Sequence, residues 1–192
     1  MEKIVLIGAG GHCKSCIDVI EMQDKFEIYG IIDIKSKVGQ KVLGYEIIGT
    51  DDNLPDIRRN IDHFLITLGQ LETPDIRISI FKKLKKLNAK LPVIISPLAH
   101  FSKHASADEG TIIMHHAVVN AGSVIGKNCI INTKALVEHD AIISNNCHIA
   151  TGAIINGSVK VGENSFIGSG AVTKQNISIA KETFLKANHL AK

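Results

Sequence analysis

A histidine flanked by two acids occupies residues 138–140 of this chain. Glu138, His139 and Asp140 fall at a corner of a repeating pattern, where side chains project outward. A carboxylate beside an imidazole can fix the imidazole tautomer and stabilise the imidazolium that forms when the ring takes up a proton. His139 is therefore a candidate general base with a carboxylate beside it. The alternative interpretation is that His139 is an ordinary surface histidine in a polar turn.

A second histidine, His148, stands where the same pattern normally has an aliphatic residue. The equivalent positions hold Ile112, Val118, Ile130, Leu136 and Ile142. A polar side chain in an otherwise aliphatic row indicates a function besides packing.

A glycine-rich segment near the N-terminus is a third candidate site. Gly8, Ala9, Gly10 and Gly11 separate an apolar stretch from a helix-like one. Because glycine has no Cβ, such a backbone can approach a phosphate closely at a helix N-terminus, where free amides and the helix dipole favour negative charge. The segment is not the complete dinucleotide fingerprint, which argues against NAD as its ligand.

A six-residue repeat must position the two histidines. Every sixth residue carries a β-branched aliphatic side chain: Ile113, Val119, Ile125, Ile131, Val137, Ile143, Ile149, Ile155, Val161 and Ile167. Small residues stand two positions earlier, and Gly or Asn often follows. This pattern predicts a parallel β-helix with three repeats in each coil. We expect it to begin near Ala99 and to end where Thr173 interrupts the aliphatic row.

The preceding part of the chain alternates strand-like and helix-like segments, which predicts a small, doubly wound α/β domain. Strands are expected at residues 3–7, 28–32, 63–68 and 91–95, and helices at 12–22, near 50–52 and at 75–87. The predicted domains are an α/β domain at residues 1–96, a β-helix domain at 97–180 and a C-terminal tail at 181–192.

Composition narrows the class of partner. The 192 residues have a net charge of +3, and no basic block suggests a nucleic-acid track. The longest apolar run near the N-terminus is too short for a membrane span or a signal peptide, so we expect a cytoplasmic protein without membrane contact. Flat aliphatic flanks on a three-sided coil favour a closed cyclic oligomer.

The repeat and the N-terminal segment together resemble a known family. The residues that carry the resemblance are Ile131-Asn132-Thr133, Val137 to Asp140, Cys147-His148-Ile149-Ala150, Gly152-Ala153, Val161-Gly162, Ser165 to Gly168, Ile7 to His12 and Gly44 to Leu54. They are similar to the hexapeptide acyltransferases of the sialic acid O-acetyltransferase type. This family includes bacterial N-acetyltransferases that act on UDP- or dTDP-linked 4-amino-4,6-dideoxy sugars for surface polysaccharides.

The resemblance implies a homotrimer with a left-handed β-helix, acetyl-CoA as cosubstrate and no metal. It implies the following roles: His139 as catalytic base with Asp140 orienting it; His148, Gly152 and Gly168 at acetyl-CoA; and Gly10, Gly11, His12, Asp33 and Gly69 at the nucleotide sugar. His139 would take a proton from the sugar amine as the amine attacks the thioester, and the Gly152 amide would stabilise the oxyanion.

Two other functions remain open at this point. O-acetylation of sialic acid would use the same base on a hydroxyl group. A non-catalytic nucleotide-sugar-binding scaffold would keep the α/β domain but would not use the Glu-His-Asp turn.

Overall fold

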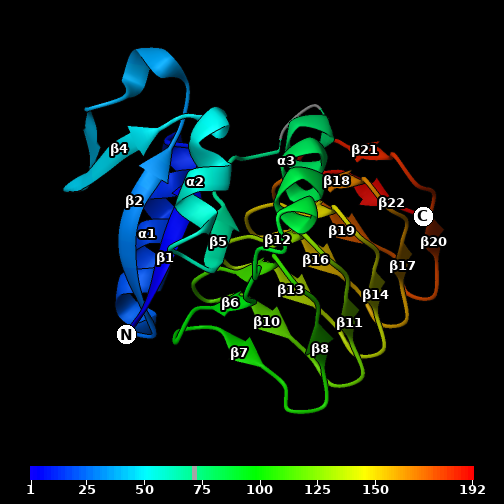
Figure 1. The fold of residues 1–192 in the computed structure, drawn as a ribbon. Helices are drawn as coiled ribbons and strands as arrows, with labels where there is room; N and C mark the ends of the chain where they lie inside the picture. Colours follow the sequence, from blue (N-terminus) through cyan, green and yellow to red (C-terminus); the bar gives the residue numbers. More distant parts are fainter. Residues whose placement is uncertain (71–72) are drawn as a thin grey trace. The chain divides into compact units, whose positions relative to one another are not determined.

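The computed structural model describes residues 1–70 and 73–192 of the chain. They form two compact units, Met1–Gly69 with Ile76–Pro92, and Gln70–Asp75 with Val93–Lys192. The predicted fold class is confirmed, because an α/β unit is combined with a left-handed parallel β-helix (Figure 1). Within the described residues, no helix has both the length and the apolar character needed to cross a bilayer.

The α/β unit is built around a five-stranded sheet in the order β3-β4-β2-β1-β5. Strand β1 pairs in parallel with β2 and β5, β2 pairs in parallel with β4, and β3 forms an antiparallel hairpin with β4. The elements are β1 (Glu2–Ile7), α1 (Gly11–Gln23), β2 (Phe26–Ile32), η1 (Lys35–Lys37), β3 (Lys41–Val42), β4 (Tyr45–Gly49), η2 (Asp51–Asn53), α2 (Leu54–Arg58), β5 (His63–Ile66) and α3 (Asp75–Lys86).

Burial explains the first β-α-β unit of this sheet. Ile4 to Ile7 of β1 are buried on both faces, as expected for a central parallel strand. Gly8 follows with φ +108°, and a Cβ there would overlap the Leu68 side chain. The glycine therefore provides both the backbone conformation and the space for the turn into α1.

The β-helix consists of two-residue strands separated by corners, and each strand pairs in parallel with the strand 18 residues later. Three sheets form its sides: β7-β10-β13-β16-β19-β22, β8-β11-β14-β17-β20 and β6-β9-β12-β15-β18-β21. The strands are β6 (Ile94–Ile95), β7 (His100–Phe101), β8 (Ser106–Ala107), β9 (Ile112–Ile113), β10 (Val118–Val119), β11 (Val124–Ile125), β12 (Ile130–Ile131), β13 (Leu136–Val137), β14 (Ile142–Ile143), β15 (His148–Ile149), β16 (Ile154–Ile155), β17 (Lys160–Val161), β18 (Phe166–Ile167), β19 (Val172–Thr173), β20 (Ser178–Ile179), β21 (Phe184–Leu185) and β22 (Leu190–Ala191).

The predicted row of aliphatic residues forms the core of the β-helix. The second residue of each strand points inward, and the side chains from Ile113 to Ile167 pack in one buried cluster. A second period of six lies in the backbone, because every sixth residue from Gly110 to Asn188 has positive φ. The side chains at these positions are diverse, so the sequence pattern did not reveal this series.

Both predicted ends of the β-helix were wrong. Thr173 does not stop the coils, since it is itself buried in β19 and the strands continue to Ala191. The expected tail therefore carries β21 and β22. At the other end, the strand expected at residues 91–95 is not in the α/β sheet, because Ile94 and Ile95 pair with Ile112 and Ile113 of the first full coil.

Candidate active site

The corner between β13 and β14 brings His139 and Asp140 together. The His139 Nδ1 atom lies 2.9 Å from Asp140 Oδ2, and both side chains are more than half exposed. Asp140 belongs to the series with positive φ.

This contact defines which nitrogen of His139 can act as a base. An ionised carboxylate only accepts hydrogen bonds, so Nδ1 of a neutral His139 must carry the proton. The lone pair then resides on Nε2, in a side chain that is more than half exposed. A base in this tautomer can accept a proton while the carboxylate stabilises the imidazolium.

Glu138 fastens the same corner to the preceding coil. Its Oε2 atom accepts hydrogen bonds from Asn120 Nδ2 at 2.9 Å and from the His139 amide at 3.3 Å. The Ser123 hydroxyl donates to the Glu138 carbonyl at 2.7 Å. Glu138 therefore holds the backbone that carries His139, while Asp140 holds its ring.

His148 is placed quite differently. It is 5% exposed in β15, and its Nδ1 lies 2.7 Å from the Gln70 carbonyl. Its Nε2 lies 3.0 Å from Asn132 Nδ2. Because Asn132 Oδ1 accepts the Thr133 amide at 2.8 Å, its NH2 group faces the ring. His148 is therefore neutral, donating through Nδ1 and accepting through Nε2.

His148 also organises its surroundings. Its ring meets Phe166 edge to face, and Phe166 stacks on Phe184 in the next coil. Gln70, which is itself buried, donates through Nε2 to the Asn146 carbonyl at 3.2 Å. Hydrogen bonds to the backbone and side chain of Gln70 thus attach it to the β-helix.

The two histidines do not meet within one chain. The His139 corner joins the sheet that contains β13 to the sheet that contains β14, whereas His148 lies in the third sheet. In a three-sided coil the third sheet lies opposite that corner. Gly152 and Gly168 lie at yet another corner, between the sheets of β15 and β16.

The glycines at that corner have structural explanations. Gly152 has φ +65°, and its amide already donates to the Thr133 carbonyl at 3.0 Å. Its amide is therefore committed to a bond between coils and is not a free oxyanion donor. Gly168 lies against the next coil, where a Cβ would be 2.5 Å from the Ala187 amide nitrogen.

In the α/β unit, the predicted glycine turn stands at an open helix N-terminus. Gly10 precedes α1, and a Cβ on Gly10 or Gly11 would have no described atom within 4 Å beyond its chain neighbours. A Cβ on Gly69 would lie 3.8 Å from the Cβ of His12. The structure thus brings Gly10, Gly11, His12 and Gly69 together, and the N-terminus of a helix suits an anion.

Asp33 braces this turn from the end of β2. Its Oδ2 accepts the Ala9 amide at 2.5 Å, its Oδ1 accepts the Ile34 amide at 2.7 Å, and Lys37 Nζ lies 3.1 Å away. Burial raises the pKa of Asp33, but the two amides and the Lys37 ammonium outweigh burial and lower that pKa below its usual value.

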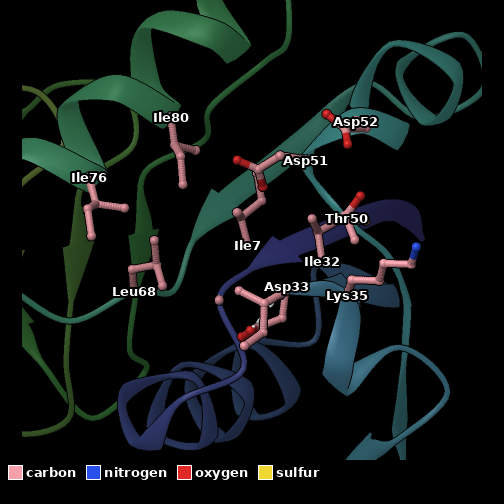
Figure 2. Close-up of a pocket in the computed structure, with 12 residues that line it drawn as sticks. Ile7, Ile32, Asp33, Lys35, Thr50, Asp51, Asp52, Leu68, Ile76 and Ile80 are labelled. Atoms are coloured by element: carbon pink, nitrogen blue, oxygen red, sulfur yellow. Dashed lines mark hydrogen bonds between the residues drawn. The ribbon is translucent and has the colours of Figure 1, made fainter.

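A pocket of about 500 Å³ opens beside Asp33 in the same unit. Figure 2 shows Leu68, Ile76 and Ile80 on one side of it, with Lys35, Thr50 and Asp51 on another. Of the residues predicted to bind substrate, only Asp33 lines it. Sequence reasoning missed the others because Thr50 to Asp52, Leu68 and α3 converge only in three dimensions. Among the described residues, no cluster of three or more His, Cys, Asp or Glu could hold a metal ion.

The fold and site define a class: a hexapeptide-repeat acyltransferase with a histidine–aspartate pair at a coil corner and an α/β domain at its N-terminus. Residues 3–84 match the PglD N-terminal domain family, and residues 140–175 match the bacterial transferase hexapeptide family with six repeats. The chain belongs to the family of sialic acid O-acetyltransferase-type hexapeptide enzymes that includes nucleotide 4-amino-sugar N-acetyltransferases.

Solved structures agree with this family over almost the whole chain. The acetyltransferase domain of PglB from Neisseria gonorrhoeae FA1090 is 31% identical with a TM-score of 0.92, and the match covers 100% of this chain and 92% of that chain. The same domain in complex with acetyl coenzyme A is 32% identical with a TM-score of 0.90, covering 97% and 88%. A mutant perosamine N-acetyltransferase from Caulobacter crescentus, in complex with CoA and GDP-perosamine, is 28% identical with a TM-score of 0.94, covering 100% and 89%.

Proposed function

We propose that this protein is an acetyl-CoA-dependent N-acetyltransferase that acts on the 4-amino group of a nucleotide-linked 4-amino-4,6-dideoxy sugar. The observation that carries the proposal is the His139–Asp140 pair, which leaves Nε2 unprotonated in a side chain that is more than half exposed. The similarity to acetyltransferases with bound CoA and GDP-perosamine supports the choice of cosubstrate and acceptor.

The reaction follows from what this pair can do. The sugar amine attacks the thioester carbonyl as the neutral amine, and it becomes acidic as its new bond to carbon forms. His139 Nε2 takes this proton, while Asp140 stabilises the imidazolium through Nδ1–H. Collapse of the tetrahedral intermediate breaks the bond between carbon and sulfur, releasing CoA as the thiol after protonation and leaving the amide on the sugar.

We assign nucleotide-sugar binding to the α/β domain, residues 1–96. Gly10, Gly11 and His12 present a helix N-terminus that suits phosphate, with Gly69 beside it. Asp33 holds the turn in shape and forms part of the pocket wall, where Leu68, Ile76 and Ile80 offer apolar contact to a nucleoside.

We assign acetyl-CoA to the β-helix domain, residues 97–180, with His148, Gly152 and Gly168 along its path. We also propose a homotrimer. His139 and His148 lie on different sides of the coil, which supports a reaction centre formed between adjacent copies. Outward-facing aliphatic side chains on the sheets beside the His139 corner support such packing: Val118, Leu136, Ile154, Val172, Val124 and Ile142. Synthesis of a nucleotide-sugar precursor from acetyl-CoA fits a cytoplasmic location.

An acceptor screen tests the proposal. Purified protein with acetyl-CoA is offered UDP-, dTDP- and GDP-linked 4-amino-4,6-dideoxy sugars and, separately, sialic acid, and released CoA thiol is measured. We expect thiol release only with a 4-amino sugar, and acetyl recovered as an amide. Acetyl transfer to sialic acid alone would show that the protein is an O-acetyltransferase and not an N-acetyltransferase. Binding of the nucleotide sugar without any binding of CoA would indicate a non-catalytic scaffold.

Subunit mixing tests the assembled site. His139→Ala and His148→Ala proteins are each expected to be impaired, and co-expression of the two should restore part of the activity through mixed trimers. Such trimers contain an interface with both native histidines. Absence of any recovery in verified mixed oligomers would place the complete site within one chain.

A further inference from the structure

Gly157 lies one coil after His139, at the same corner of the β-helix. A Cβ added to Gly157 would be 2.7 Å from both Cε1 and Nε2 of His139, which is well inside the optimal separation of about 3.5–4.0 Å for carbon atoms. The imidazole therefore rests directly on the glycine backbone. Gly157 is buried, although it lies on an outer corner.

The backbone itself does not require glycine at this position. The φ angle of Gly157 is outside the left-handed region, so a side chain would cause no conformational strain. The equivalent corner position in the other coils carries a side chain, and all of these residues are exposed: Lys103, Ala121, His139 and Gln175. The three atoms nearest to a Cβ on Gly157 all belong to His139. The imidazole is thus the reason that position 157 has no side chain.

A second glycine borders the pair from the opposite direction. Gly122 lies one coil before Asp140, and a Cβ there would overlap the Asp140 carboxylate. Gly122 also has φ +78°, so its conformation gives a separate reason for glycine. Gly157 is the position where contact with the imidazole alone explains the residue.

We propose that Gly157 is a positioning residue for the general base, because the absence of its side chain lets the His139 imidazole lie against the next coil with Nδ1 on Asp140. A methyl group at this position would lift the ring and change the direction of Nε2. The kinetic consequence rests on the proposed acetyltransferase function, whereas the ring geometry does not.

The kinetic test compares Gly157→Ala with Gln175→Ala, a substitution at the same corner position one coil further on. Misplacing a reacting group by about 1 Å can cost up to about 100-fold in rate, so we expect kcat of Gly157→Ala to fall about 10- to 100-fold. The KM values for acetyl-CoA and for the amino sugar should change by less than about twofold, because the added methyl group acts on the His139 ring and not on a contact with either substrate. Gln175→Ala should leave both parameters unchanged.

A double-mutant cycle separates positioning of His139 from any other role. In the His139→Ala background the methyl group has room, so Gly157→Ala should cause no further loss of residual activity. Removal of the imidazole by His139→Ala should also restore any thermal stability that Gly157→Ala alone loses. An equal kinetic loss with and without the imidazole would overturn the proposal.

Nitrogen-15 NMR of the imidazole provides a readout independent of catalysis. The His139 ring signals are identified by their absence in His139→Ala, at a pH where the ring is neutral. We expect protonated Nδ1 in the native protein and Gln175→Ala, and a mixture of tautomers in Gly157→Ala. If the native protein acetylates no amino sugar but the tautomer shift occurs, the proposed function fails and the positioning role stands. An active Gly157→Ala protein with native kinetics and an unchanged tautomer would refute the positioning role alone.

Discussion

Two corners of the β-helix use the same backbone conformation for different purposes. At the corner before β12, β15 and β18, the residues with positive φ are Asn128, Asn146 and Asn164. Asn128 Nδ2 donates to Asn146 Oδ1 at 3.0 Å, and Asn146 Nδ2 donates to Asn164 Oδ1 at 3.1 Å. These amides form a ladder that joins consecutive coils.

At the His139 corner the equivalent residues are Gly122, Asp140, Ser158 and Asn176. Here Asp140 bonds to a side chain of its own coil rather than to the next one. Polar side chains that form hydrogen bonds from one coil to the next stabilise the β-helix. A polar pair within one coil, such as His139 and Asp140, can instead leave a ring nitrogen unprotonated for a reaction. The two corners should therefore respond to substitution in opposite ways.

The largest expected effect is on catalysis at the His139 corner. Removal of a general base typically costs about 10² to 10⁴ in rate, so His139→Ala should lower kcat by that factor in the thiol-release assay. Because the side chain is more than half exposed, the melting temperature should stay close to that of the native protein. Full activity in His139→Ala would show that this corner is not the catalytic one.

The Asn ladder should behave in the reverse manner. Asn146→Ala loses hydrogen bonds worth about 1 kcal/mol each. Alanine also lacks the polar side chain that lets asparagine adopt the left-handed conformation, at a further cost of about 1 kcal/mol. We expect about 2–3 kcal/mol of lost unfolding free energy in urea titrations, with kcat per folded molecule unchanged.

Asn146→Gly is the matched control, since it removes the same hydrogen bonds without the conformational cost. It should be roughly 1 kcal/mol less damaging than Asn146→Ala, because glycine tolerates positive φ. If both variants were as stable as the native protein, the ladder would not be the structural counterpart of the catalytic pair.

Asp140→Asn should have a smaller kinetic effect than the loss of His139. Asparagine tolerates positive φ, but its NH2 group can donate to Nδ1 and drive the proton to Nε2. Loss of a hydrogen bond to a charged group costs about 1.5 kcal/mol or more, which corresponds to roughly a tenfold lower kcat. Asn176→Asp, at the equivalent position two coils further on, should change nothing. A native rate for Asp140→Asn would mean that the carboxylate does not orient the base.

The partners of the Asp33 carboxylate are two backbone amides and the Lys37 ammonium, whereas the partner of Asp140 is an imidazole. We therefore expect substitution of Asp33 to change the stability of the protein. Its folded pKa is lowered; the stabilisation is therefore complete above the unfolded value of about 3.9 and is lost as the pH falls through the lower folded pKa. Asp33→Asn should be less stable by about 1 kcal/mol at pH 7.

The stability difference between native and Asp33→Asn proteins should shrink when unfolding is measured at increasingly acidic pH below about 4. A difference that stays constant from pH 7 down to pH 3 would show that the charge of Asp33 contributes nothing.

The sequence predicted the parts of the molecule where burial dictates residue type. Inward positions such as Ile131 and Val137 must be compact and aliphatic, so their spacing predicted the coils. The C-terminal end of the β-helix was not predicted, because Thr173 is a polar residue at a buried position. Its hydroxyl oxygen accepts a hydrogen bond from the Asn156 backbone amide at 2.9 Å. Among site residues, the Glu138–Asp140 turn was visible because charge interrupts the repeat. The roles of Gly157 and Gln70 depend on contacts 18 and 78 positions away in the chain, which no local pattern encodes.

The attachment of Gln70 to the β-helix affects how this protein can be recombined with its relatives. Gln70–Asp75 is grouped with the β-helix, although it interrupts the α/β unit in the sequence. A chimera joined at a single point near Pro92 would pair the His148 of one parent with the Gln70 of another. Successful exchange of acceptor specificity between family members should therefore require two crossovers, so that the short segment at residue 70 travels with the coils whose histidine it contacts.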